Sequence, residues 1–237
     1  MYSGIMPPSP LFRDRICAGE QLAAAIRATV TELRSSGSVQ PIVYALPRGG
    51  IPVAAQVARL LGCPLDVVVA KKISLPENPE LAIGAVTADG QVLWAKPTPF
   101  RRQNFPLRQA ALTEALNKAR SQLAQLTPAC PQIDLQGAIA ILVDDGIATG
   151  MTMAVAAQAL RAQHPAEVWL CAPVAPPSLL PWLQQWVDRM IVLETPQSFF
   201  SVSSFYAEFP QVETEAALVY LQQQTDWLGG PTASLDR

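Results

Sequence analysis

The chain has 237 residues, of which 50% are hydrophobic and 15% are charged, and its formal net charge is −2. It can therefore bury a full core as one large domain, and the composition excludes a disordered or highly charged protein. The slightly acidic balance gives no electrostatic reason to expect non-specific nucleic-acid binding.

The first part of the chain predicts a loose arm followed by alternating helices and strands. Residues 1–10 contain three prolines and show no periodicity, which is typical of an arm that does not pack. Apolar residues recur at helical spacing in residues 19–37, which end in a Ser-Ser-Gly stop signal. Short apolar runs predict strands at residues 41–46 and 65–70, and residues 52–61 between them predict a helix.

The middle of the chain departs from this alternation. Residues 73–85 contain Pro76, Glu77, Asn78 and Pro79, and these helix and strand breakers predict a mobile loop. A hairpin through Asp89-Gly90 is expected to end near residue 95. Residues 96–132 predict a locally basic helical insertion, whose charges either reach toward a phosphate or form a solvated helix face.

The last part of the chain returns to alternating strands and helices. Strands are predicted at residues 138–143, 167–173 and 190–193, and helices at residues 153–161, 176–187 and 214–224. This order predicts an α/β fold with a mostly parallel, doubly wound sheet. We expect a single domain over residues 11–228, in which residues 194–211 form either a small hood over a substrate or a cover for the core, and a loose tail at residues 229–237.

The stretch from Ala138 to Thr152 carries the strongest chemical signal. Its apolar strand ends on Asp144 and Asp145, and a loop of small residues and hydroxyls leads into a helix. Unpaired backbone N–H groups at a helix start, with the positive end of the helix dipole, can hold a phosphate. The two carboxylates lie where a parallel strand opens onto a crevice, where they could bind a divalent cation or the hydroxyls of a sugar. One loop could therefore hold both ends of a sugar phosphate.

A second loop, Pro47-Arg48-Gly49-Gly50, follows the first predicted strand. A guanidinium beside two glycines allows backbone amides and a fixed cation to approach an anion closely. By itself this motif is equally consistent with a tight turn that carries an exposed arginine.

Together these motifs resemble the type I phosphoribosyltransferases, which use phosphoribosyl diphosphate (PRPP). Four apolar residues, two acids, Thr-Gly and a final threonine match the PRPP loop of that family from Ala140 to Thr152, and the Pro-Arg-Gly-Gly sequence matches its pyrophosphate loop. An uncharacterised bacterial subgroup, with Pro-Arg-Gly-Gly and Val-Asp-Asp-Gly-Ile-Ala-Thr-Gly, is the most similar. In the family the peptide bond before the basic residue is typically cis, which here implies Pro47–Arg48.

The resemblance also implies roles for individual residues. The 5′-phosphate of PRPP would bind at Ala148, Thr149, Gly150, Met151 and Thr152. The ribose hydroxyls, directly or through Mg²⁺, would bind at Asp144 and Asp145, which are also the expected metal ligands. The remaining expected contacts are Arg48, Gly49 and Gly50 with the pyrophosphate, Lys72 as the catalytic cation, and Phe199 or Phe200 stacked on the base; the alternative for the two rings is packing onto the core.

The expected activity is transfer of the phosphoribosyl group from PRPP to a nitrogen nucleophile, such as a nucleobase, with Mg²⁺ as cofactor. In the hypoxanthine-guanine enzymes of the family an aspartate stands at the position of Ala148, so this sequence resembles the adenine enzymes more in that loop, without establishing adenine. The main alternative is a PRPP or nucleotide sensor that has lost turnover. A magnesium phosphohydrolase would need a second cluster of metal ligands, which the sequence lacks.

Cysteine usage and hydropathy indicate the compartment. The four cysteines are scattered without a Cys-x-x-Cys pair and the sequence has one histidine, so a zinc site is not expected. No segment resembles a signal peptide, and no apolar run reaches the roughly 18 residues of a membrane span. These features predict a cytoplasmic, reduced protein. The family resemblance implies that its partners are small molecules, PRPP and a base, and it leaves a homodimer open.

Overall fold

A computed structural model describes residues 10–34, 40–75, 78–95 and 105–228. The predicted arm at residues 1–10 and the tail at residues 229–237 therefore fall almost entirely outside the described residues, as do residues 96–104 of the predicted insertion. Among the helices in the described ranges, none is both long and apolar enough to span a bilayer.

The larger sheet confirms the predicted doubly wound α/β fold. All of its strands are parallel, in the order β2-β1-β6-β7-β8. They are β1 (Pro41–Ala45), β2 (Leu65–Val67), β6 (Ile139–Val143), β7 (Glu167–Val174) and β8 (Arg189–Glu194). The chain runs outward from β1 to β2 and then builds in the other direction from β6, so the order reverses between β1 and β6. Ligands bind at such a reversal in open α/β sheets.

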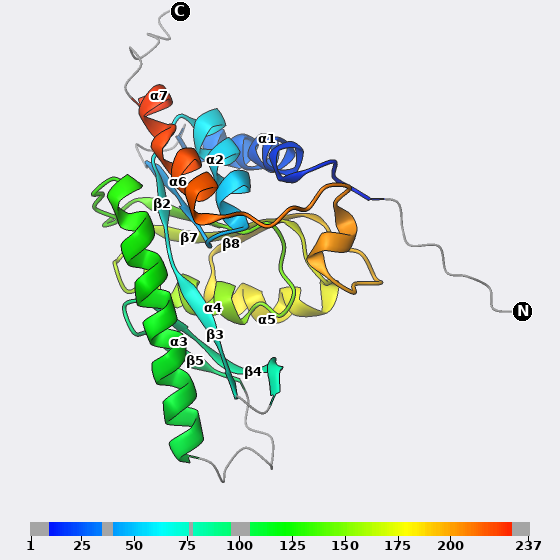
Figure 1. The fold of residues 1–237 in the computed structure, drawn as a ribbon. Coiled ribbons are helices and arrows are strands. Elements are labelled where there is room, and N and C mark those ends of the chain that lie inside the picture. The colour runs from blue at the N-terminus through cyan, green and yellow to red at the C-terminus, as the bar shows by residue number, and fades with distance from the viewer. Residues whose placement is uncertain (1–9, 35–39, 76–77, 96–104, 229–237) are drawn as a thin grey trace, which may run out of the picture.

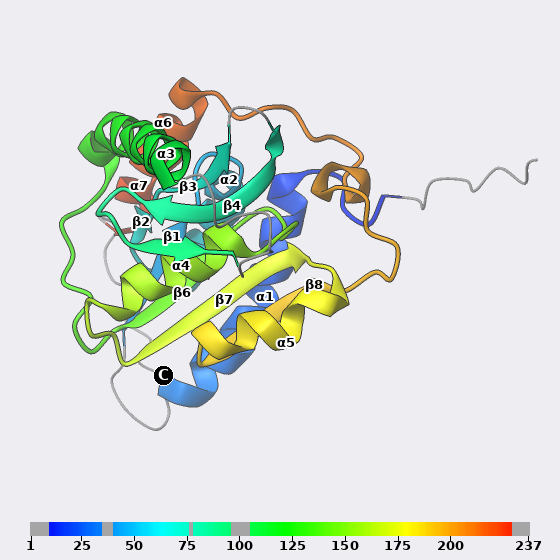
Figure 2. The same cartoon turned by 90° about the horizontal axis from the view of Figure 1, so that it is seen from below.

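Helices cover both faces of this sheet. Figure 1 shows α1 (Arg15–Arg34) and α2 (Gly50–Leu61) on one face, and α4 (Met151–Arg161) and α5 (Leu180–Leu183) on the other. Figure 2 views the molecule from the α4 and α5 side. Two C-terminal helices, α6 (Thr214–Gln222) and α7 (Gln224–Leu228), lie beside α2, where the sequence predicted one final helix.

The strand β6 shows why the sheet is apolar on both faces. Ile139 and Ile141 belong to the core beneath α1 and α2, whereas Ala140 and Leu142 belong to the core beneath α4. Successive side chains in a strand point to opposite faces, so a strand that is covered on both sides must be apolar at every position. The unbroken apolar run seen in the sequence is the consequence.

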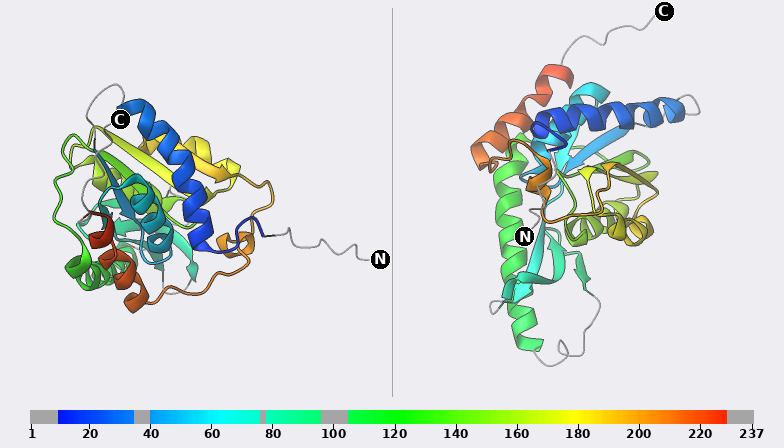
Figure 3. Two further views of the ribbon diagram at one scale, coloured as in Figure 1. Left: turned by 90° about the horizontal axis from the view of Figure 1, so that it is seen from above. Right: turned by 90° about the vertical axis from the view of Figure 1, so that its right-hand side faces the viewer.

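A second, antiparallel sheet stands beside the first. It contains β3 (Ala70–Leu75), β4 (Asn78–Thr87) and β5 (Val92–Trp94), and the long helix α3 (Phe105–Leu126) packs along it. Ile73 and Ile83 of the sheet share a small core with Ala111 and Ala115 of α3. Figure 3 shows α3 running beside these strands and extending away from the parallel sheet. The helix lies within the predicted insertion, and the hairpin between β4 and β5 was also expected.

Two predictions about this region were wrong. Residues 65–70 do not form one strand, because β2 ends at Val67 and Ala70 begins β3 in the other sheet. Residues 73–85 were expected to be a mobile loop, but residues 73–75 belong to β3 and residues 78–85 belong to β4. Asn78 and Pro79 are the first two residues of β4, and burial of Ile73 and Ile83 against α3 stabilises the ladder, so local propensity did not decide the outcome.

The segments after β7 and β8 form short turns of helix. The helix predicted over residues 176–187 consists of three pieces, and residues 194–211 contain one 3₁₀ turn. These pieces are α5 and the 3₁₀ turns Pro177–Leu179, Gln184–Trp186 and Val202–Phe205. Phe205 and Tyr206 are buried against Phe12, which precedes α1. The segment therefore packs onto the N-terminal end of the described chain and reaches the sheet reversal from there.

Candidate functional site

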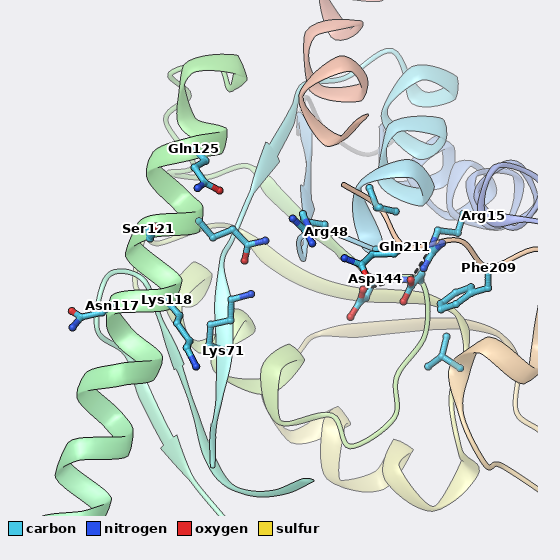
Figure 4. Close-up of a pocket in the computed structure, with 15 residues that line it drawn as sticks. Arg15, Arg48, Lys71, Asn117, Lys118, Ser121, Gln125, Asp144, Phe209 and Gln211 are labelled. Atoms are coloured by element: carbon cyan, nitrogen blue, oxygen red, sulfur yellow. Dashed lines mark hydrogen bonds and ion pairs between the residues drawn. The ribbon is translucent and has the colours of Figure 1, made fainter. Parts of the chain in front are cut away.

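A cavity of about 1030 Å³ opens at the carboxyl ends of β1 and β6, at the point where the strand order reverses. Figure 4 shows α3 and β3 on one side of it, Arg48 in the middle, and the acids with the segment after β8 on the other side. The lining residues come from six parts of the chain. They are Arg15, Arg48, Gly49, Lys71, Asn117, Lys118, Ser121, Gln122, Gln125, Asp144, Asp145, Val202, Phe209, Gln211 and Val212.

The two sequence motifs meet at the floor of this cavity. A Cβ atom at Gly50 would lie 2.9 Å from the carbonyl oxygen of Val143 and 3.0 Å from Oδ1 of Asp144, and a Cβ atom at Gly49 would overlap the carboxylate of Asp145. Both positions therefore require glycine because the loop after β1 lies directly on the acids after β6. The peptide bond Pro47–Arg48 is cis, as the family resemblance implied.

Asp144 lies at the floor with few stabilising partners. Its Oδ1 accepts a hydrogen bond from the backbone N–H of Asp145 at 2.9 Å. Within the described ranges no lysine or arginine forms an ion pair with this carboxylate. Burial raises the pKa of Asp144 well above its ordinary value of 3.8, and the charge of Asp145 raises it further. A cation at this carboxylate would therefore relieve an unfavourable charge.

Asp145 differs from Asp144 because it is already paired. Nε of Arg15 donates to its Oδ2 at 2.8 Å, and the two residues are only 8% and 9% exposed. The hydroxyl of Tyr206 donates to the backbone carbonyl oxygen of Asp145 at 2.6 Å. Burial raises the pKa of the Asp145 carboxyl, and the Arg15 guanidinium opposes that rise. No sequence pattern indicated this partner, because 130 positions separate the two residues.

Three cations line the cavity between its middle and α3. They are Arg48, Lys71 and Lys118. Nη1 of Arg48 donates to the hydroxyl of Thr214 at 3.0 Å. Burial lowers the pKa of Lys71, and the charges of Arg48 and Lys118 lower it further, so Lys71 lies close enough to both cations to be repelled by them. Such a cluster favours a multiply charged anion.

The cavity is lined by Lys71 and not by the expected Lys72. Lys72 is exposed and lines a separate cavity of about 370 Å³ beside α3. Adjacent side chains in β3 point to opposite faces, so the two lysines cannot both face the acids. The sequence supplied a lysine pair, and the pairing of β3 with β4 decided which member points inward.

The loop before α4 lies outside this cavity. Ala148 and Thr149 are exposed, and Gly150 adopts a left-handed conformation with φ of 73° immediately before α4 begins at Met151. The first N–H groups of a helix have no partner within the helix. The structure thus brings Asp144 and Asp145 to Arg48 and Gly49, whereas residues 148–152 are not among the lining residues.

Neither of the two expected stacking rings lines the cavity. Phe199 packs against Phe205, with ring centroids 5.0 Å apart, and Phe200 is 83% exposed. The aromatic ring that does line the cavity is Phe209. The guanidinium of Arg15 lies over this ring, with its carbon 3.6 Å from the ring centroid.

The helix α3 contributes a polar wall that sequence reasoning did not identify. Asn117, Ser121 and Gln125 are spaced four residues apart and therefore lie along one side of the helix, with Gln122 beside them. Oε1 of Gln122 is buried and has no hydrogen-bond partner in the described structure. The four-residue spacing of polar side chains was the signal available in the sequence.

The two carboxylates at the cavity floor, Asp144 and Asp145, are the candidate ligands for Mg²⁺. In the described ranges no group of three or more His, Cys, Asp or Glu side chains is arranged to hold a metal ion. Mg²⁺ is commonly held by one or two carboxylates together with substrate oxygens and water, and does not need an all-protein cage. Asp144, a carboxylate without a described cationic partner, fits that arrangement.

Comparisons with known proteins agree with the fold and with the family that the sequence resembles. The family model described as the phosphoribosyl transferase domain matches residues 13–209. Two curated Mycobacterium tuberculosis proteins, from strains CDC 1551 and H37Rv and provisionally named phosphoribosyl transferases, are each 35% identical over 214 residues, which is 90% of this chain.

These alignments cover 47% of each curated relative, so the chain spans about half of their length. The crystal structure of TT1426 from Thermus thermophilus is 33% identical, with a TM-score of 0.72 over 90% of this chain and 98% of that one. The chain belongs to the phosphoribosyl transferase family.

Proposed function

We propose that this protein transfers the 5-phosphoribosyl group from PRPP to a nitrogen nucleophile, such as a nucleobase, and releases pyrophosphate. The observation that carries the proposal is the contact between the two motif loops at one cavity, with a carboxylate without a described cationic partner on its floor and three cations on its wall. A sugar that carries a pyrophosphate presents its hydroxyls to the carboxylate and a multiply charged anion to the three cations. Family membership and the sequence motifs support the same substrate.

In the proposed reaction the bond between ribose C1 and the pyrophosphate oxygen breaks, and its electron pair leaves with the pyrophosphate. The nitrogen lone pair forms the new bond to C1, and the nucleophile loses a proton. Arg48 and Lys71 stabilise the negative charge that develops on the leaving group, because cations already held at the site need little reorganisation as that charge grows. Lys118, which is exposed and pairs with Glu114 on α3, adds to the positive charge of the same wall. Lys71 takes the role that was expected of Lys72.

Other parts of the site are proposed to contact the 5′-phosphate, the ribose and C1 of PRPP. The N–H groups of the loop at residues 148–152 and the start of α4 bind the 5′-phosphate. Asp144 would hold the ribose hydroxyls and Mg²⁺, and the ion would supply positive charge that offsets the charge of the pyrophosphate. Phe209, Val202 and Val212 form the apolar side of the cavity and keep water away from C1.

The test is to incubate the purified protein with PRPP, Mg²⁺ and a panel of nucleobases while pyrophosphate release is measured. We expect release with at least one base, and loss of that release in Arg48→Gln. Arg13→Met is the matched control, because Arg13 is exposed, pairs with Asp14 and does not line the cavity. PRPP binding without release for any base would instead indicate a sensor, and absence of both would refute the proposed function.

A further inference from the structure

We propose that Arg15 and Asp145 form a latch that fixes residues 206–212 to the end of β6, so that Arg15 is a positioning residue. Of the two adjacent acids, Asp144 then contacts the sugar or its metal, and Asp145 acts through Arg15. This inference rests on the proposed function, because it divides the roles of two acids in that site.

The geometry of the ion pair supports this division. The separation of 2.8 Å between Nε of Arg15 and Oδ2 of Asp145 is that of a strong charge-assisted hydrogen bond, and both side chains are buried. The same carboxylate rests on Gly49, where even a methyl group would overlap it. Oδ2 of Asp145 is therefore enclosed by a guanidinium and by backbone, which leaves no room for a metal ion at that oxygen.

Arg15 also holds the segment that follows β8. Its Nη1 donates to the carbonyl oxygen of Pro210 at 2.7 Å, and its guanidinium lies 3.6 Å from the ring centroid of Phe209. The planar, forked guanidinium is suited to hold several partners in fixed directions. A single side chain thus connects the acid after β6 to the segment that forms the apolar side of the cavity.

Tyr206 closes the same connection from the other side. Its hydroxyl donates to the backbone carbonyl oxygen of Asp145 at 2.6 Å, and its ring lies 4.9 Å from that of Phe209. Residues 206–210 are therefore tied to Asp145 through the main chain as well as through the carboxylate. A shift of Asp145 would move this segment. It would also move Asp144, because Oδ1 of Asp144 accepts a hydrogen bond from the backbone N–H of Asp145.

The position of Arg15 on its own helix points to the same role. Arg15 is the first residue of α1, and the first turn of α1 contains no acidic residue. A cation at a helix N-terminus is disfavoured by the helix dipole. The helix gains nothing from an arginine at this position, so the contact with Asp145 and residues 209–210 explains its presence better than helix stability does.

The test compares four proteins: the wild type, Arg15→Met, Asp145→Leu and the double variant. Calorimetric titration with PRPP in the presence of Mg²⁺ gives the affinity of each. We expect each single variant to bind PRPP on the order of tenfold more weakly, which is typical when a group that orients a ligand-binding residue is removed. The double variant should bind more tightly than Asp145→Leu, because no uncompensated buried charge remains.

Two further measurements separate positioning from general loss of structure. Hydrogen exchange of the backbone amides in residues 206–212 should accelerate in Arg15→Met and remain slow in the control Arg13→Met. The Mg²⁺ concentration required for PRPP binding should rise in Asp144→Asn by more than it does in the double variant. If a single variant does not fold, Arg15→Lys keeps the charge but cannot reach both acceptors, and should show intermediate affinity with faster exchange in residues 206–212.

The latch is refuted if the double variant binds no better than Asp145→Leu, because the carboxylate itself would then be required. It is also refuted if Arg15→Met binds PRPP as tightly as the wild type or more tightly. Asp145 would then bind the ligand itself, and Arg15 would only compete with the ligand for its carboxylate. Failure of the wild type to bind PRPP refutes the proposed function instead. The effect of the variants on exchange in residues 206–212 still tests the latch in that case.

Discussion

Asp144→Asn is expected to change stability and ligand affinity in opposite directions. In the structure the carboxylate accepts one described hydrogen bond, from the backbone N–H of Asp145, and forms no ion pair with a described lysine or arginine. An asparagine can still accept that hydrogen bond through its side-chain oxygen, and it removes a charge that burial and Asp145 disfavour more than Arg15 offsets. The variant should therefore unfold at a higher temperature than the wild type at pH 7.

The pH dependence of this gain follows from the pKa of Asp144. The pKa is raised well above 3.8 in the folded protein, so the native state binds a proton more tightly than the unfolded state does. The wild type consequently loses stability as the pH rises from about that unfolded value through the folded pKa. The advantage of the asparagine variant should be absent near pH 3.8 and should grow toward neutral pH; each kcal/mol corresponds to a Tm change of about 2–4 °C for a chain of this size.

The same substitution should weaken ligand binding. A hydrogen bond to a charged group is worth about 1.5–3 kcal/mol, so the Kd for PRPP with Mg²⁺ should rise roughly 10- to 150-fold. Thermal unfolding from about pH 4 to about pH 8 and calorimetric titration check the two effects. A lower Tm for Asp144→Asn at pH 7 would refute the claim that this carboxylate is uncompensated, and an unchanged Kd would refute its role in binding.

Three further substitutions test the cavity wall. Lys71→Met should weaken pyrophosphate inhibition of the transfer reaction at least roughly tenfold more than Lys72→Met does, since a partly buried cation contributes about 1.5–3 kcal/mol to an anion contact; equal effects would show that the inward lysine is misassigned. Gly50→Ala should lower the free energy of unfolding by about 1–3 kcal/mol in urea titrations, because its methyl group meets the backbone of β6, and an unchanged midpoint would contradict that contact. Phe209→Ala should raise the KM of the acceptor base by up to roughly tenfold, as expected for loss of about 0.5–1.5 kcal/mol of contact between aromatic rings, while Phe200→Ala should have little effect. A larger effect of Phe200→Ala would support Phe200, one of the two rings expected from the sequence to stack on the base.

Local patterns predicted the parallel sheet well. The strands β1, β6 and β7 each contain an apolar run, because a strand covered by helices on both faces leaves no room for polar residues within it. The edge strand β8 is only partly buried, and its apolar run, residues 190–193, lies between Arg189 and Glu194. The same local reasoning failed for residues 73–85, where proline and asparagine indicated a loop. Pairing of β3 with β4 and packing against α3 override those preferences, and neither effect is visible in a short window of sequence.

For the site, the sequence by itself determined which loops carry the chemistry. The acids after β6 and the arginine with two glycines after β1 are short-range patterns, and parallel strands bring their carboxyl ends to one edge of the sheet. The tertiary structure decided which side chains of those loops and of their neighbours face the cavity. It selected Lys71 over Lys72 through strand pairing, brought Phe209 to the cavity in place of Phe199 or Phe200, and paired Asp145 with Arg15 across 130 residues. Contacts between distant segments depend on how whole elements pack, so no local pattern could have distinguished two adjacent aspartates that the fold treats differently.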